Sequence, residues 1–248
     1  MQNRYVGDVG DFAKYGLLRL LMNETDLSLG VLWWLFADET HNSDGRHVSY
    51  LKNPAFGALD PQLHRILEEL LSAGRRSVRA VAKSGILPNG TIFFDTPIFK
   101  SSSVAVSRQL RDRQRAAWLQ KAFTATADCD MIFFDPDNGL ETASVARHSP
   151  KSGKYVFWDE LLPFWDRGQS LVIYHHLNRT MTVTKQTAIL QEKFAARFVE
   201  ANLVRYFLFR RGSCRHFWLV AQKEHALHCR KVINQIAQSE WREYFEVG

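Results

Sequence analysis

An apolar run that ends abruptly in polar residues decides the fold of this chain: Ile132-Phe133-Phe134-Asp135-Pro136-Asp137-Asn138-Gly139-Leu140-Glu141. The run from Met131 to Phe134 predicts a buried parallel strand, because such strands are apolar on both faces. In an open α/β sheet, ligands bind outside the carboxyl ends of the strands. Pro136 fixes its own φ and favours extended backbone at Asp135, so the turn should be stiff. We therefore expect this turn to face a ligand; the alternative is an ordinary turn whose acids cap the next helix.

Length and composition indicate one globular domain, residues 1–248, with residues 1–25 as an N-terminal motif and helix. The net charge of +6 and the pI of about 9.3 favour an anionic partner such as nucleic acid, although only weakly. Cys129, Cys214 and Cys229 have neither disulfide-framework nor zinc spacing, which fits a reducing compartment. The N-terminus is polar and no apolar run is long enough to span a membrane, so we expect a cytoplasmic protein.

Strand-like and helix-like segments alternate along the chain. Two Gly-Asp steps precede an apolar helix near the N-terminus, with Asp8 or Asp11 as its N-cap. The other predicted helices cover 61–73, 103–126, 156–165, 184–201 and about 225–240. Strands linked by crossovers are predicted at 29–36, 77–81, 91–94, 131–134 and 170–174. Two further strands, 203–210 and 215–221, are separated by a short turn and predict an antiparallel hairpin at one edge of the sheet.

Five crossover-connected strands followed by a hairpin resemble the Rossmann-like class I fold of S-adenosylmethionine-dependent methyltransferases. That resemblance implies an α/β protein with a seven-stranded mixed sheet, a C-terminal antiparallel hairpin and helices on both faces. The Gly-x-Gly-x-x-Gly turn of a nucleotide-binding dehydrogenase is absent from the sequence.

Three short motifs resemble the RlmJ-type ribosomal RNA adenine methyltransferases more closely. The N-terminal stretch 7–15 has the spacing of that family's Gly-Asn-x-x-Asp-x-x-Lys-His segment, with Asp8 for Asn and Tyr15 for His. The loop 40–46 keeps the Thr, the His, the last Gly and the Arg of the family's cofactor loop, while Ser43 and Asp44 depart from it. Asp135-Pro136 matches the first half of the Asp-Pro-Pro-aromatic motif of amino methyltransferases, and Asp137-Asn138 does not match the second half.

The resemblance implies transfer of a methyl group from S-adenosylmethionine to an exocyclic amine, adenine in the family, of nucleic acid. Expected catalytic residues are Asp135, Pro136, Asp137, Asn138 and Lys14. Expected cofactor-binding residues are Tyr5, Gly7, Asp8, Asp11, Asp38, Thr40, His41, Asn42, Gly45, Arg46 and Asp95. No metal is expected. With Asn138 in place of the motif's aromatic residue, Tyr5, Tyr15 or Trp158 would have to stack on the base.

Two other classes of function compete with this one. Several acids fall at or just after predicted strand ends and could bind magnesium or manganese in a nuclease, with histidines assisting: Asp38, Asp44, Asp95, Asp135, Asp137 and Glu141. A non-catalytic nucleic-acid binder would instead use the basic face of helix 103–126 and the basic segment 205–215. Arg108, Arg111, Arg113, Arg115 and Lys121 make up that basic face.

Overall fold

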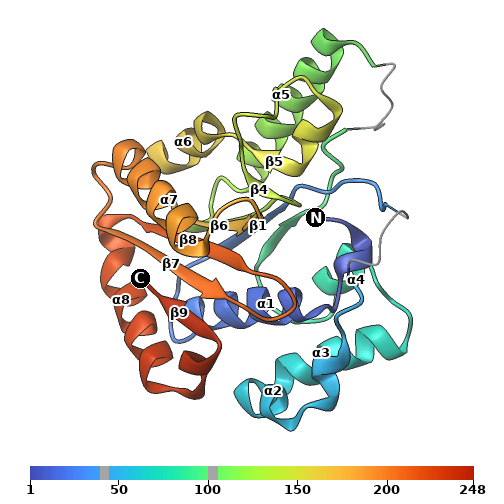
Figure 1. Ribbon diagram of the computed structural model, residues 1–248, viewed down its shortest axis with the longest axis vertical. Coiled ribbons are helices and arrows are strands. Elements are labelled where there is room, and N and C mark those ends of the chain that lie inside the picture. Colours follow the sequence, from blue (N-terminus) through green and yellow to red (C-terminus); the bar gives the residue numbers. More distant parts are fainter. Residues whose placement is uncertain (40–44, 100–105) are drawn as a thin grey trace.

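A seven-stranded mixed sheet divides the molecule into three layers (Figure 1). The computed structural model describes residues 1–39, 45–99 and 106–248. Within these residues the strand order is β2-β1-β3-β6-β8-β7-β9. The α/β class, the mixed sheet and its helices agree with the sequence prediction.

The sheet consists of a parallel half and an antiparallel half. The parallel strands are β2 (Ile92–Phe94), β1 (Leu29–Trp33), β3 (Met131–Asp135) and β6 (Ser170–His176). The antiparallel strands are β8 (Arg215–Ala221), β7 (Leu203–Phe209) and β9 (Phe245–Val247). Strands β7 and β8 form the predicted hairpin, and β8 is inserted between β6 and β7. The edge of the sheet is β9, so the expectation that the hairpin itself forms the edge is wrong.

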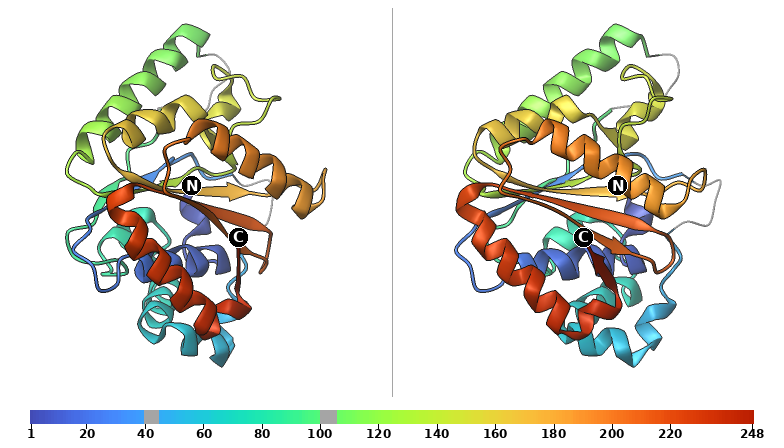
Figure 2. Two further views of the ribbon diagram at one scale, coloured as in Figure 1. Left: turned by 90° about the vertical axis from the view of Figure 1, so that its left-hand side faces the viewer. Right: turned by 60° about the vertical axis from the view of Figure 1, so that its left-hand side comes forward.

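Helices cover both faces of the sheet (Figure 2). One face carries α1 (Val9–Leu21), α2 (Pro54–Leu59), α3 (Pro61–Ser72), α4 (Val78–Ala82) and α8 (Lys223–Gln238). The other carries α5 (Arg108–Ala125), α6 (Trp158–Asp166) and α7 (Val183–Arg197). Short 3-10 turns occupy Asn3–Tyr5, Ser49–Lys52, Pro150–Lys154 and Glu240–Glu243, and a small parallel pair joins β4 (Gly139–Leu140) to β5 (Tyr155–Val156).

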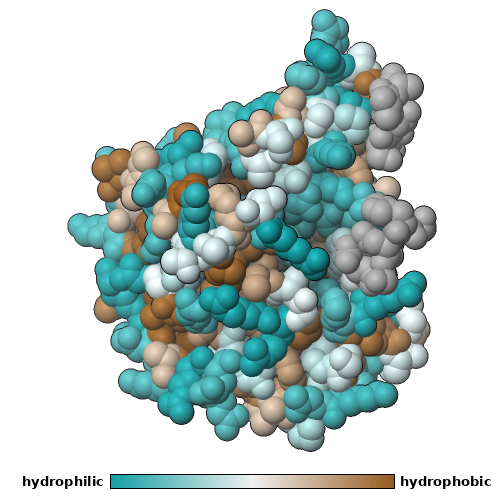
Figure 3. Space-filling view, viewed as in Figure 1, coloured by the Kyte–Doolittle hydropathy of each residue, from teal (hydrophilic) through white to brown (hydrophobic). Residues whose placement is uncertain are grey.

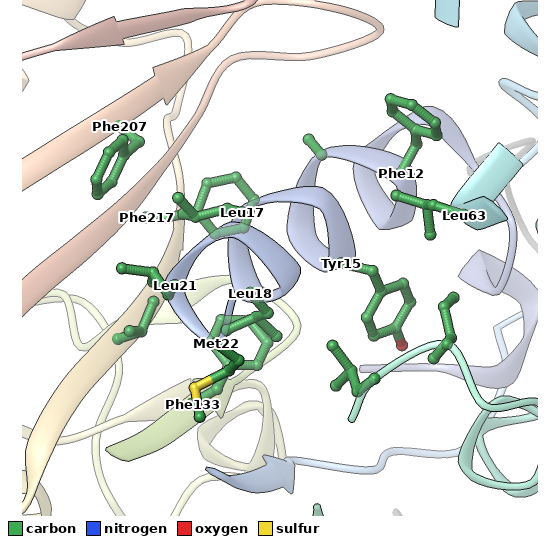
Figure 4. Packing of buried hydrophobic residues seen from close by; sticks show 14 of the residues in the cluster. Phe12, Tyr15, Leu17, Leu18, Leu21, Met22, Leu63, Phe133, Phe207 and Phe217 are labelled. Carbon is green, nitrogen blue, oxygen red and sulfur yellow. The ribbon is translucent and has the colours of Figure 1, made fainter. Parts of the chain in front are cut away.

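Strand β3 contributes to two separate hydrophobic cores because its side chains alternate between the faces. Phe133 points toward α1, where it belongs to one cluster with Leu17, Leu21 and Phe217 (Figure 4). Phe134 points the other way and packs on Trp34 and Phe164. The fully buried pattern confirms the expectation drawn from the apolar run 131–134. Each such buried aromatic side chain stabilises the fold by roughly 1.5–3 kcal/mol.

The predicted strand at 77–81 is instead the short helix α4. Ser77 caps it: the Ser77 side-chain oxygen accepts a hydrogen bond from the Ala80 backbone nitrogen at 3.2 Å. Val78 and Val81 are three positions apart and both are buried, which is the spacing of a helical face. The seventh strand of the sheet is therefore β9, a three-residue strand that follows the last helix.

Part of the basic face of α5 is structural. Arg111 and Arg115 are buried, while Arg108, Arg113 and Lys121 are exposed. Arg115 forms a two-pronged ion pair with Glu160 of α6 and also donates to the backbone carbonyl of Tyr155 at 2.7 Å. This arginine therefore ties α5 to α6 rather than facing a partner.

No helix in the three described stretches combines the length and apolar character needed to cross a membrane. On the face seen in Figure 3, hydrophilic residues cover most of the surface and apolar residues occur in small groups between them.

A histidine buried in the sheet predicts how stability depends on pH. His216 is fully buried, and burial, with Arg210 adding to it, lowers its pKa from 6.5 to about 4. Between these values the unfolded chain binds a proton that the folded chain does not, so the free energy of unfolding should fall as pH falls from 6.5 toward 4. His216→Gln should reduce the slope of the free energy of unfolding against pH by up to one proton, which is about 1.4 kcal/mol per pH unit.

Urea unfolding of both proteins across this range measures the effect. Comparison above about pH 7, where the histidine is neutral in both states, isolates any packing loss caused by the substitution. Parallel curves for the two proteins below that pH would contradict the assignment to His216.

Candidate functional site

A pocket of about 690 Å³ lies at the carboxyl ends of β3 and β6. Most of its lining comes from four parts of the chain: the N-terminal segment through Lys14, the turn 135–138, the stretch 174–179 and the hairpin turn 212–215. Gly45, His47 and Val183 complete it. The turn after Asp135, expected to face a ligand, thus lines a pocket. Of the residues expected at the site, the pocket gathers Tyr5, Asp8, Asp11, Lys14, Gly45, Asp135, Pro136, Asp137 and Asn138.

The N-terminal segment enters the pocket through a capped helix start. The Asp8 carboxylate accepts a hydrogen bond from the Asp11 backbone nitrogen at 3.0 Å, which confirms Asp8 as the N-cap of α1. Asp11 in turn accepts one from the Gly7 backbone nitrogen at 3.0 Å. Gly7 has a φ of +82°, and a side chain there would collide with Leu71. The glycine therefore allows a close approach to Leu71, and it does not line the pocket.

Lys14 joins this helix to the central strand. Its Nζ lies 2.8 Å from Asp11 Oδ1 and 2.7 Å from Asp135 Oδ2, and the three side chains are at most 4% exposed. Asp11 and Lys14 are one helical turn apart, so both face the end of β3. The segment expected to bind cofactor and the turn expected to orient the amine thus meet through one ammonium group.

Burial shapes the charges of this triad. It raises the pKa of Asp135 and of Asp11, and Lys14 only partly offsets the shift. Burial by itself would lower the pKa of Lys14, but the two carboxylates outweigh it and hold that pKa well above its usual range. The lysine therefore stays charged, and the two acids around it hold protons more readily than free aspartates.

Asp137 is held by a second network. Its Oδ2 accepts a hydrogen bond from Gln2 Nε2 at 2.8 Å and lies 3.3 Å from Lys154 Nζ. Lys154 also pairs with Glu39, whose pKa is lowered because the bonds from Lys154 and Gln2 outweigh the opposing effect of burial. The Asp137 side chain is 2% exposed, so it fixes the turn against the N-terminal residues.

The backbone of Asn138 anchors the same turn on the other side. Its N–H donates to the Lys154 carbonyl at 2.8 Å, and its carbonyl accepts from His176 N at 3.1 Å. His175 accepts a hydrogen bond from the Leu140 backbone nitrogen at 3.0 Å, and burial, with neighbouring His216 and His176, lowers its pKa to about 3. His175 is therefore a neutral structural acceptor beneath the turn.

Several expected cofactor residues lie away from the pocket lining. Asp95 pairs with Arg79 at 3.0 Å, Asp38 accepts from the Arg4 backbone nitrogen at 3.2 Å, and Arg46 is exposed. Gly45 does reach the pocket, and its φ of +82° and close contact with the Arg4 carbonyl require glycine there. Thr40, His41 and Asn42 lie outside the described residues, as do Ser43 and Asp44.

Of the six acids considered for a metal-dependent nuclease, Asp44 lies outside the described residues, and the other five do not gather around one metal position. Asp95 binds Arg79, Glu141 accepts from the Trp158 backbone nitrogen at 2.9 Å, and Asp135 binds Lys14. In the part of the chain that the structure describes, no group of three or more His, Cys, Asp or Glu side chains is placed to hold a metal ion.

Of the three aromatic residues considered for base stacking, only Tyr5 lines the pocket. It is half-buried, and the Arg4 guanidinium lies 4.9 Å from its ring centroid. Tyr15 is fully buried and Trp158 is 6% exposed, packed on Phe194. Both belong to the hydrophobic cores on the two faces of the sheet and do not line the pocket.

The structure adds residues that were not expected in the methyltransferase site. They are Tyr174 and His176–Arg179, at the end of β6 and directly after it, and Gly212–Arg215 in the hairpin turn. Burial raises the pKa of Tyr174 to about 12. The polar residues that follow the predicted strand 170–174 were a visible signal for the first group. Arg215 ends the basic segment 205–215 considered for a nucleic-acid binder, but nothing in that segment indicated that it is buried in this pocket.

Comparisons of the chain with family models, with curated proteins and with solved structures found no match.

Proposed function

We propose that this chain is an S-adenosylmethionine-dependent methyltransferase that acts on an exocyclic amine, adenine by resemblance, of nucleic acid. The observation that carries the proposal is the triad of Lys14, Asp11 and Asp135 at the carboxyl end of β3. It brings the two motifs that resemble RlmJ-type enzymes to one pocket, although 121 residues separate Lys14 from Asp135.

The sheet supports the same class. Strands β1, β3 and β6 run parallel, and the last strand of the hairpin, β8, runs antiparallel between β6 and β7. This insertion is what distinguishes the class I methyltransferase sheet from that of a nucleotide-binding dehydrogenase. The predicted strand at 77–81 is absent from the parallel half, so the likeness extends to β2, β1, β3, β6 and the hairpin.

The polar groups of the pocket fit the cofactor. S-adenosylmethionine carries an ammonium group, a carboxylate and a positively charged sulfonium, and it would supply an electrophilic methyl group. Asp8 offers a carboxylate to the cationic groups, and Tyr5 offers a ring beside the loop that ends at Gly45. Both oxygens of Asp11, by contrast, are held by Lys14 and the Gly7 backbone nitrogen. The volume of about 690 Å³ lies within the usual range of small-molecule sites.

Asp135 would orient the acceptor. One of its carboxylate oxygens is held by Lys14 at 2.7 Å, which fixes the side chain in the pocket wall. The carboxyl group can then accept a hydrogen bond from the target amine and aim the nitrogen lone pair at the methyl carbon. The cofactor, when bound, would supply the methyl group, and the Asp135 carboxylate would take up the proton that the amine loses as it becomes methylated. Most of the rate gain in such a site comes from holding the two reactants aligned.

The lining of the pocket suits a polyanion. His47, His176 and Arg179 line it and are exposed, and Arg46 and Arg211 are exposed next to lining residues in the sequence. Such basic side chains contact phosphates without reading sequence. Together with the net charge of +6, they favour nucleic acid over a small neutral acceptor.

Calorimetry tests the cofactor assignment. We expect S-adenosylmethionine and its demethylated product to bind the wild type with one site per chain, and magnesium and chelator to leave that binding unchanged. Lys14→Ala should weaken cofactor binding and also slow the chemical step, because Lys14 holds both Asp11 of the N-terminal motif and Asp135, which would orient the amine. Thermal unfolding of the variant checks that the pocket is still folded. If neither S-adenosylmethionine nor its demethylated product binds, the cofactor assignment is wrong.

Substitutions of Asp135 separate methyl transfer from metal chemistry. Asparagine keeps a carbonyl acceptor, so Asp135→Asn should retain measurable methyl transfer, about tenfold below wild type. Asp135→Ala lacks the acceptor and should lose about 100-fold or more. In a metal-dependent nuclease both variants would be equally inactive, because the charge itself holds the ion. Equal loss in both, together with chelator-sensitive cleavage by the wild type, would favour the nuclease.

A further inference from the structure

Arg215 is a buried cation with no ionic partner among the residues that the structure describes. It begins β8, is 5% exposed and forms no ion pair with a carboxylate of residues 1–39, 45–99 or 106–248. Its Nη2 donates to Ser213 Oγ, while its buried Nε has no hydrogen-bond partner. A buried guanidinium with donors left over is costly unless an anion completes it.

The surroundings of Arg215 favour an anion. A methyl group at Gly10 would lie 1.5 Å from Arg215 Nη1, so the guanidinium packs directly on the first turn of α1. The N-terminus of a helix attracts negative charge, which adds to the attraction of the guanidinium. The neighbouring carboxylate, Asp8, already accepts the Asp11 N–H. On its other side Arg215 faces the Phe209 ring, with 5.8 Å to the centroid.

We propose that Arg215 binds a phosphate of the nucleic-acid acceptor, an inference that rests on the proposed methyltransferase function. Arg215 lines the same pocket as Asp135. Strand β6 separates β8 from β3, and Arg215 pairs with His176, two residues beyond the level of Asp135, so the two residues stand roughly 12 Å apart. A single nucleotide can span that gap with its base at Asp135 and its phosphate at Arg215. A planar guanidinium can grip a phosphate with two parallel hydrogen bonds.

The carboxylate of the cofactor is the competing anion, because the guanidinium packs on Gly10, within the N-terminal motif expected to bind the cofactor. The strand order favours the phosphate, since Arg215 lies beyond β6 from the end of β3, where the methyl group would be transferred. His176, Asn178 and Arg179 line the pocket near the same strand ends and offer further polar contacts to a nucleotide backbone. The variants below distinguish the two anions.

Binding of a labelled single-stranded RNA oligonucleotide, measured by fluorescence anisotropy over a range of salt concentrations, tests the proposal. Arg215→Gln should weaken binding about tenfold or more and lower the salt slope by about 0.7, the value for one phosphate contact on a single strand. Arg215→Lys should keep the salt slope and lose part of the affinity, because an ammonium cannot make the two-pronged contact. Cofactor affinity, measured by calorimetry, should stay unchanged in both variants.

Two further variants keep the test decisive. Arg230→Gln is the matched control, since Arg230 is exposed on α8 and donates only to the Asn202 carbonyl at 2.9 Å; its RNA binding should equal that of wild type. Ser213→Ala removes the hydroxyl that accepts from Nη2 and orients the guanidinium, and it keeps the charge. Because the guanidinium is then less well oriented, RNA binding should weaken a few-fold at unchanged thermal stability, which tests the site even if Arg215→Gln fails to fold.

The outcomes separate this proposal from the proposed function. Loss of cofactor binding with intact RNA binding in Arg215→Gln would overturn it and assign the anion to the cofactor's carboxylate. Unchanged RNA binding in Arg215→Gln and Ser213→Ala, or no RNA binding by the wild type, would overturn it as well. RNA binding that depends on Arg215 in a protein that transfers no methyl group would support the phosphate site and reject the methyltransferase.

Discussion

The contact of Lys14 with Asp11 and Asp135 is the interaction on which the pocket depends. It fixes the first turns of α1 against the end of β3, and the network of Gln2, Lys154 and Asp137 extends the same junction. Removing a single charge from such a buried group leaves its partner without compensation, which costs about 3–5 kcal/mol. The buried charges of this junction therefore stabilise it only when every partner is present.

The two halves of the sheet give the pocket two kinds of wall. The parallel half supplies Asp135, and with the N-terminal segment it forms an acidic wall whose charges Lys14 balances. The antiparallel half supplies Arg215, a cation without a counter-charge among the described residues. Because β8 is inserted beside β6, both walls face one space. The acidic wall suits a methyl donor with cationic groups, and the wall with Arg215 suits an acceptor with phosphates.

Local patterns made much of this predictable. The apolar run 131–134, the Asp8 cap and the hairpin 203–221 each depend on neighbouring residues, so sequence reasoning located them correctly. The prediction of a strand at 77–81 was wrong, because a pattern of five residues is too short to distinguish a strand from a helix. The Ser77 side chain caps the segment and favours the helix. Strand β9 is shorter still. Asp137 binds Gln2, far away in the sequence, and Arg215 is buried by residues that are also distant in the sequence. No local sequence pattern encodes such contacts.

Mass spectrometry of nucleosides tests the central claim most directly. RNA and DNA are incubated separately with the protein and with S-adenosylmethionine carrying a deuterated methyl group, then digested to nucleosides. The account predicts a deuterated methyl group on an exocyclic amine, adenine first among the bases, in one of the two nucleic acids. Nucleic acid cut in a chelator-sensitive manner, with no deuterated nucleoside in either sample, would contradict it.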